Sequence, residues 1–193
     1  MASKIRTLTF AALFAALIAV CAQLTVPMPS GVGFTLQTFA VALCGYLLGV
    51  KAGAAALLVY LLVGLAGAPV FSGFQGGLHV LFGPTGGFLL GFFPVAALCG
   101  LAAGWKGALR WFWGLPGLLL CHLGGVVQFA LLREMELLPA FLLVSAPFLV
   151  KDVLSLAAAA LLAWRLGPLL ARYGIPPRRE KQEHQVCRTD GKA

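Results

Sequence analysis

Charged residues are scarce in this chain: Asp, Glu, Lys and Arg together make up 10% of its 193 residues, while 61% are hydrophobic. Soluble domains are about 45–50% apolar and about 25% charged. One globular core could not bury this excess, because a chain of this size leaves roughly a third of its surface exposed. The composition therefore excludes a water-soluble enzyme. It also excludes a disordered protein, which needs low hydrophobicity and high charge.

Several kinds of site are also missing. The five cysteines form no C-x-x-C pair or other metal spacing, and four of them lie inside apolar runs. No phosphate-binding loop of the form G-x-x-x-x-G-K-[ST] occurs, so an ATPase would have to be another chain. The net charge of +8 comes from basic residues that lie between apolar runs instead of forming one face. We therefore expect no metal, no cofactor and no nucleic-acid partner, and membrane lipid as the surroundings.

Long uncharged runs indicate a multi-pass membrane protein. No charged residue lies between Arg6 and Lys51 or between Lys51 and Lys106, and a helix needs about 20 apolar residues to cross the hydrocarbon core. A Pro-rich segment interrupts the first run and a Gly-rich segment interrupts the second, so each run holds two spans. The sequence predicts an all-α fold with six transmembrane helices, at about residues 7–24, 35–50, 52–68, 87–104, 111–132 and 140–164.

The positive charges fit this count. With the N-terminus inside, twelve Lys and Arg residues, Arg110 among them, fall on one side and only Arg133 falls on the other. Such a bias marks the cytoplasmic side, so both termini are predicted to be cytoplasmic. A signal peptide ending near Val20-Cys21-Ala22 is the alternative for the N-terminus, but it would leave five helices. We predict one transmembrane domain over 1–170 and a polar, disordered cytoplasmic tail over 171–193.

Two extracytoplasmic connections, Thr25 to Gln37 and Ala68 to Gly87, contain no Lys, Arg, Asp or Glu. The second is too apolar for a solvated loop and too rich in glycine for a regular helix. Irregular backbone at membrane depth is tolerated only where protein or a water-filled cavity covers it. This segment is therefore either a lid over a ligand pocket, where glycine permits close approach, or a packed connection whose glycines serve helix contacts.

Asp152 is the most informative single residue, because it lies near the middle of the sixth predicted span. An Asp there costs about 2.5–3.5 kcal/mol on insertion scales, which indicates a role facing the protein interior. A structural ion pair with Lys151 is the alternative. Consecutive residues of a helix do not face each other, so we expect two separate partners instead of a direct pair. His79 and His122 are interpreted first as structural residues.

Five short motifs follow one another in a specific order between about Ala11 and Ala163. They are Phe34-Thr35-Leu36-Gln37, Gly67-Ala68-Pro69-Val70-Phe71, Gly76-Gly77, Gly83-Pro84-Thr85-Gly86-Gly87-Phe88, and Pro147-Phe148 followed by Asp152. With these motifs the chain resembles the BioY family, the biotin-specific S components of energy-coupling-factor (ECF) transporters. The Gly-Pro-Thr-Gly-Gly block with a downstream intramembrane Asp is the most specific combination.

The resemblance implies a transport protein of a bacterial or archaeal cytoplasmic membrane that captures biotin from outside with high affinity. It also implies partners, namely a transmembrane coupling (T) protein and two ABC-type ATPases. S components use an Ala-x-x-x-Ala face of the first helix to dock on the coupling protein, and Ala11, Ala15 and Ala19 lie along one face here. Packing against a neighbouring helix of the same chain is the alternative for this face.

Biotin as a ligand would assign roles to individual residues. Its ureido ring has two N–H donors and one carbonyl acceptor, so Asp152 could accept from the ring, and Gln75, or else Gln37, could serve the carbonyl. Its apolar ring and tail suit aromatic side chains, namely Phe71, Phe74 and Phe82. The predicted binding set is Thr35, Gln37, Phe71, Gln75, His79, Gly83, Thr85, Lys151 and Asp152.

The chain departs from the family pattern at two points. Family members commonly carry a Lys three residues after the Asp, where this chain has Ser155 and places its Lys at 151. No Arg in the glycine-rich run can receive the biotin carboxylate, which leaves Lys151, backbone N–H groups or water. Two other functions remain open: an S component for another vitamin, and an intramembrane enzyme using Ser72 and His79, for which a paired nucleophile and base is not evident.

Overall fold

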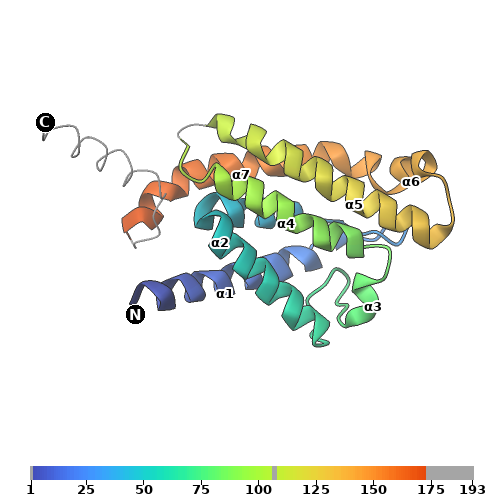
Figure 1. Cartoon of the computed structure of the whole chain (residues 1–193), viewed down its shortest axis with the longest axis horizontal. Helices are drawn as coiled ribbons and strands as arrows, with labels where there is room; N and C mark the ends of the chain where they lie inside the picture. The colour runs from blue at the N-terminus through green and yellow to red at the C-terminus, as the bar shows by residue number, and fades with distance from the viewer. Residues whose placement is uncertain (1, 106–107, 173–193) are drawn as a thin grey trace, which may run out of the picture.

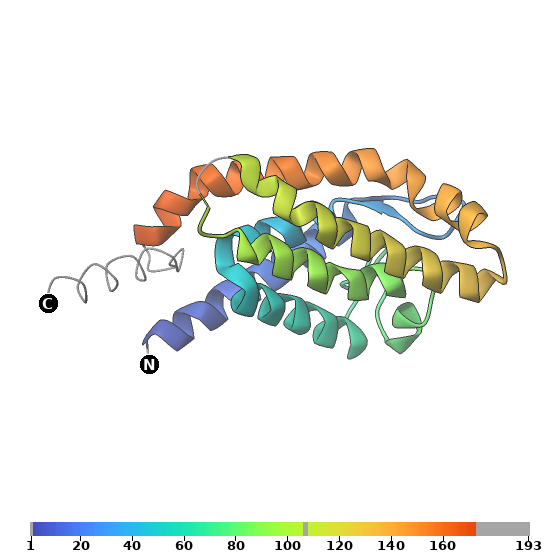
Figure 2. The same cartoon turned by 45° about the horizontal axis from the view of Figure 1, so that its top comes forward.

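The computed structural model describes residues 2–105 and 108–172, which form an elongated bundle of helices (Figure 1). The helices are α1 (Ala2–Gln23), α2 (Gln37–Leu65), α3 (Leu78–Leu81), α4 (Gly86–Leu101), the 3-10 helix η1 (Ala108–Gly114), α5 (Leu115–Arg133), α6 (Leu137–Val144) and α7 (Ala146–Arg172). The strands β1 (Thr25–Val26) and β2 (Phe34–Thr35) form a short antiparallel hairpin. The beginning of α1 and the end of α7 lie at one end of the bundle, and α3 and α6 lie at the other (Figure 2).

Four stretches of the described chain are long and apolar enough to cross a membrane: Ile5–Gln23, Gln37–Leu65, Arg110–Arg133 and Ala146–Arg172. Helix α4 is apolar but shorter. The expected all-helical class is confirmed, while the six crossings and the cytoplasmic termini stay predictions. Helix α7 runs through the first two residues of the predicted tail, and 173–193 lie outside the described residues.

Helix α2 consists of two segments that turn at Gly49, where φ is 78° and ψ is 177°. Glycine adopts this positive φ without steric cost. A Cβ built on Gly53 would lie 3.5 Å from the Cα of Gly45, although eight residues of a straight helix advance about 12 Å. The segments 37–48 and 50–65 therefore pack against each other, and the break predicted near residue 51 lies two residues earlier.

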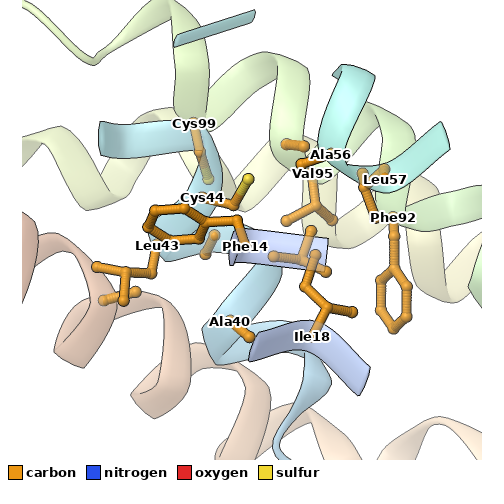
Figure 3. Close-up of a cluster of buried hydrophobic side chains, with 14 of the residues drawn as sticks. Phe14, Ile18, Ala40, Leu43, Cys44, Ala56, Leu57, Phe92, Val95 and Cys99 are labelled. Carbon is orange, nitrogen blue, oxygen red and sulfur yellow. The ribbon is translucent and has the colours of Figure 1, made fainter. Parts of the chain in front are cut away.

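The core forms where α1, α2 and α4 cross, and Figure 3 shows their side chains meeting there. Phe14 and Ile18 point inward from α1 against Cys44 and Leu57 of the two α2 segments. Helix α4 also packs closely on α5, because its side facing α5 carries glycine. A Cβ on Gly91 would lie 2.5 Å from the Cα of Cys121. Small residues let helix backbones approach in this way inside a membrane.

Arg110 differs from the exposed cytoplasmic charge that the sequence predicts, because it is only 4% exposed. Its Nε and Nη2 donate to the carbonyl oxygen of Ala160 at 3.1 and 2.8 Å, and its guanidinium carbon lies 5.7 Å from the ring centroid of Tyr46. A buried charge needs such partners. Arg110 therefore ties η1 to α7, a role that a count of charges along the sequence cannot reveal.

Candidate functional site

A cavity of about 230 Å³ lies between the hairpin, the start of α2, the connection after α2, and helices α4, α5 and α7. Small-molecule pockets commonly measure about 300–1,000 Å³ and are mostly apolar with a few polar groups. This cavity is somewhat smaller than that range, so it suits a compact ligand. Its polar lining residues are Thr25, Thr35, Gln37, Thr38, Ser72, Gln75, Thr85, His122, Lys151 and Asp152.

The glycine-rich connection between α2 and α4 forms part of the cavity wall. Phe71, Ser72, Gly73 and Gln75 line it, and the backbones of Phe71 and Gln75 pair with N···O distances of 2.9 and 3.3 Å. Its glycines also permit tight packing, since a Cβ on Gly76 would meet the Ala68 carbonyl oxygen at 2.3 Å. The connection therefore lines the cavity and is itself tightly packed, while its role as a lid stays a prediction.

Asp152 is the centre of a buried polar cluster contributed by three elements. Its Oδ2 lies 3.3 Å from Nε2 of His122 on α5. The other ring nitrogen of His122, Nδ1, lies 2.8 Å from the hydroxyl of Ser145, which separates α6 from α7. Asp152, His122 and Ser145 are 5%, 4% and 0% exposed. The imidazole of His122 thus links the carboxylate to the Ser145 hydroxyl and fixes this side of Asp152.

Lys151 contacts Asp152 directly, and the prediction of two separate partners instead of a direct pair is wrong. The Lys151 Nζ lies 2.5 Å from Oδ1 of Asp152, and it also donates to the Thr35 carbonyl oxygen at 2.7 Å. Adjacent side chains leave a helix about 100° apart, but the four-carbon stem of Lys spans that angle. The ammonium also lies 5.0 Å from the ring centroid of Phe34, a favourable cation–π distance.

One oxygen of the Asp152 carboxylate has unused hydrogen-bonding capacity. Oδ1 forms the ion pair with Lys151, and no hydrogen bond from another described residue reaches it. A carboxylate oxygen has two lone pairs, so a contact with one ammonium leaves capacity for a further donor. Because Asp152 lines the cavity, this oxygen can accept an N–H or O–H from a bound molecule.

Gln37 and Thr35 form a second polar group on the same wall. The amide nitrogen of Gln37 donates to the Tyr60 hydroxyl at 2.8 Å, and its amide oxygen accepts from the Thr35 hydroxyl at 3.1 Å. The Tyr60 hydroxyl in turn donates to the Val70 carbonyl oxygen at 3.3 Å. Both ends of the Gln37 amide are thus engaged, which favours Gln75 as the amide that meets a ligand.

The structure brings most of the predicted binding set together at this cavity. Seven of those residues line it, namely Thr35, Gln37, Phe71, Gln75, Thr85, Lys151 and Asp152. His79 and Gly83 are not among the lining residues: His79 is exposed on α3, and the Gly83 carbonyl oxygen accepts from Gln128 at 2.8 Å. Phe74 and Phe82 are also misplaced in the prediction, since each is 71% exposed.

His122 is the main residue that sequence reasoning undervalued. The sequence alone favours a structural role for His122, yet the side chain lines the cavity and contacts Asp152. The available signal was its ionisable side chain inside an apolar span, which by itself indicates a functional site.

The apolar wall of the cavity comes from residues such as Val80, Phe88, Phe92 and Phe148 and not from Phe74 and Phe82. Ser72 donates to the Thr25 hydroxyl at 3.0 Å, which offers no support for a Ser72–His79 pair. Among the described residues, no three His, Cys, Asp or Glu side chains gather as a metal site would require.

The face of α1 that the sequence predicts to dock on a partner is wrong, because its alanines pack into the core. Ala11 and Ala15 are 1% and 7% exposed and belong to the core, and Ala19 is half-buried against it. They lie on the same side as Phe14 and Ile18, which pack on α2 (Figure 3). A helix repeats every 3.6 residues, so Ala11 and Ala15 fall on one face and Ala12 and Ala16 on the next. Periodicity alone does not tell which of the two faces is buried. Among the alanines of α1 whose burial the structure describes, Ala12 and Ala16 are exposed.

Comparison with known proteins gives consistent matches over most of the chain. The sequence model of the BioY family matches residues 1–172. The biotin transporter BioY of Thermotoga maritima is 40% identical over 166 residues, covering 85% of this chain and 97% of the relative. A probable biotin transporter BioY of Pyrococcus horikoshii is 40% identical over 164 residues, covering 84% of this chain and 97% of the relative.

A solved structure shares the fold. A crystal structure of the S-component for biotin from an ECF-type ABC transporter superposes with a TM-score of 0.78, covering 85% of this chain and 92% of that one. The two chains are 24% identical, so this likeness concerns the arrangement of helices alone.

Proposed function

The chain belongs to the BioY family, and on that premise we propose that it binds biotin and imports it as the S component of an ECF transporter in the cytoplasmic membrane. The observation that carries the proposal is the buried Asp152 carboxylate in the cavity wall, whose Oδ1 contacts the Lys151 ammonium and accepts no hydrogen bond from the other described residues. The ureido ring of biotin supplies N–H donors, and one of them can use the remaining lone pair of this oxygen.

The chain is a multi-pass membrane transport protein and not an enzyme, as its transporter relatives and its four apolar candidate spans indicate. This agrees with the expectation from composition. The isolated chain then needs only to bind its ligand, and the energy for import comes from partner subunits that are part of the proposal.

Lys151 complements Asp152 in the proposed complex. An ammonium has three N–H donors, of which one is directed to Thr35 and one toward Asp152. The third can serve the ureido carbonyl oxygen, beside the N–H that Asp152 accepts. The apolar ring and tail of biotin then lie against the aromatic wall, where Phe148 packs 5.6 Å from the ring centroid of Phe34. Such a division of polar head and apolar body is usual for small-ligand sites.

Binding should require neither ATP nor a metal ion. We expect the purified chain to bind radiolabelled biotin at equilibrium in the presence of EDTA, with dethiobiotin competing and thiamine not competing. Displacement by thiamine would instead favour an S component for another vitamin. A strict requirement for Mg-ATP in binding by the isolated chain would contradict the proposal.

Gly64 should be needed for the cavity wall. A Cβ at this position would meet the Phe71 ring at 2.2 Å, and Phe71 is 1% exposed and packs edge-on against Tyr60. Because overpacking of this kind costs about 1–3 kcal/mol, we expect Gly64→Ala to lower biotin affinity by about tenfold. Gly167→Ala is the matched control, since nothing lies within 4 Å of the added methyl group. Unchanged affinity in titrations of Gly64→Ala would show that Phe71 does not shape the site.

A docking surface for the coupling protein is part of the proposal. We place it on the exposed side of α1 at Ala12 and Ala16, four residues apart, instead of at the buried pair Ala11 and Ala15. Small residues at this spacing let a second helix approach closely in a membrane.

A further inference from the structure

Gln23, the last residue of α1, holds a distant segment of the chain through its side-chain amide. Its Nε2 donates to the carbonyl oxygen of Phe71 at 3.1 Å, and its second N–H is shared between the carbonyl oxygens of Pro69 and of Ala19 in its own helix, both at 3.4 Å. Its Oε1 accepts from the backbone N–H of Phe74 at 2.9 Å. One side chain thus engages three backbone groups within six consecutive residues, and those residues belong to the connection that covers the cavity.

The segment that Gln23 holds contains one residue, Phe74, that is not fixed by packing. Phe74 has φ of 58° and is 71% exposed. Side chains other than glycine disfavour this backbone region, which persists only where neighbouring groups impose it. The hydrogen bond from the Phe74 N–H to Gln23 is such a constraint. The residues on either side of Phe74, which are Gly73 and Gln75, line the cavity.

Two neighbouring contacts support the same arrangement. The Ser72 hydroxyl donates to the Thr25 hydroxyl at 3.0 Å, which adds a second link between this segment and the chain just after α1. The second half of the connection is held in the same manner from α5, where Nε2 of Gln128 donates to the carbonyl oxygens of Leu81 at 2.9 Å and Gly83 at 2.8 Å. Side-chain amides of two helices, α1 and α5, therefore hold the two halves of the cover.

We infer that Gln23 is a positioning residue that keeps segment 69–75 closed over the cavity and thereby sets how slowly a bound ligand leaves. The inference rests on the proposed function in taking biotin as that ligand. Gln23 itself is absent from the cavity lining, so its effect acts through the segment and not through contact with the ligand. Loss of its hydrogen bonds should raise the dissociation rate and leave the association rate nearly unchanged, because an open segment hinders neither entry nor the contacts made at Asp152.

The test is a pulse–chase measurement on the purified full-length protein. Radiolabelled biotin is bound, chased with excess unlabelled biotin, and the dissociation rate is compared between the wild type and Gln23→Met, which keeps the length of the side chain and removes its hydrogen bonds. We expect dissociation to be about tenfold faster, since three hydrogen bonds of modest net value are lost, with association changed less than about threefold. Hydrogen–deuterium exchange of peptides over 69–76 in the ligand-free protein should also be faster.

Thr9→Val is the matched control, because Thr9 is a polar residue of α1 whose hydroxyl donates only to its own helix, at the Ile5 carbonyl oxygen. Wild-type rates of dissociation and of hydrogen exchange in Gln23→Met would overturn the inference but not the proposed function. Failure of the wild-type protein to bind biotin would overturn the proposed function. The exchange measurement would then still test whether Gln23 holds the segment closed. If Gln23→Met does not fold, Gln23→Glu retains the acceptor for Phe74 and should release biotin at an intermediate rate. Failure of both variants to fold would assign Gln23 to folding and overturn the positioning role.

Discussion

Asp152→Asn is expected to weaken biotin binding strongly, lowering the affinity by about tenfold or more. The change places an amide nitrogen or a neutral oxygen where the ureido N–H needs a carboxylate. It also leaves the Lys151 ammonium, 2.5 Å from Oδ1 in the wild type, without its counterion. The broken ion pair destabilises the free and the bound protein alike, so the loss of affinity comes from the unpaired ureido N–H, at about 1–3 kcal/mol. Isothermal titration of the purified variant measures the effect.

A double variant separates a ligand role of Asp152 from a purely structural one. Lys151→Met with Asp152→Asn removes both charges, so no unpaired ammonium is left in the site. If the two side chains served only as each other's counterions, this double variant would recover binding, and that recovery would refute the proposed ligand contacts of both Asp152 and Lys151. Ser155→Ala, one turn later on α7, is the control, since Ser155 is buried but is not part of the cavity lining. We expect its affinity to match the wild type.

Ala16→Trp is expected to abolish ATP-driven biotin uptake while the isolated protein still binds biotin within about threefold of the wild type. Ala16 is exposed on α1, so an indole there does not disturb the core, yet it holds a partner helix away from the close approach that small residues permit. Uptake measured with the coupling module co-expressed, and binding measured on the purified chain, separate the two effects. Normal uptake by Ala16→Trp would show that this face of α1 does not dock.

Two further tryptophan variants serve as controls for Ala16→Trp. Ala158→Trp introduces the same bulk at an exposed alanine of α7 and should leave both binding and uptake unchanged. Ala15→Trp places the indole in the core, where Ala15 is 7% exposed, and should destabilise the protein. Binding and uptake should then be lost together, because overpacking in a close-packed core forces backbone shifts.

The sequence by itself determined the class of protein and most members of the candidate site. Composition excludes a soluble chain, because the apolar excess has no core large enough to bury it. An intramembrane Asp is so unfavourable that its position alone indicates a polar interior site, and Asp152 does line the cavity. Interruptions by glycine and proline located the connections, since these residues act on local backbone geometry, which sequence reports directly.

Only the tertiary structure decided which side chains meet. Periodicity identified two alanine faces on α1, but packing on α2 decided that the face of Ala11 is buried. The Lys151–Asp152 contact depends on the reach of a flexible side chain, and the pairing of His122 with Asp152 joins helices 30 residues apart in sequence. Gln23 likewise finds its partners 46 to 51 residues away. Such contacts depend on how helices cross, and a helix pattern encodes which side is apolar but not which neighbour it will meet.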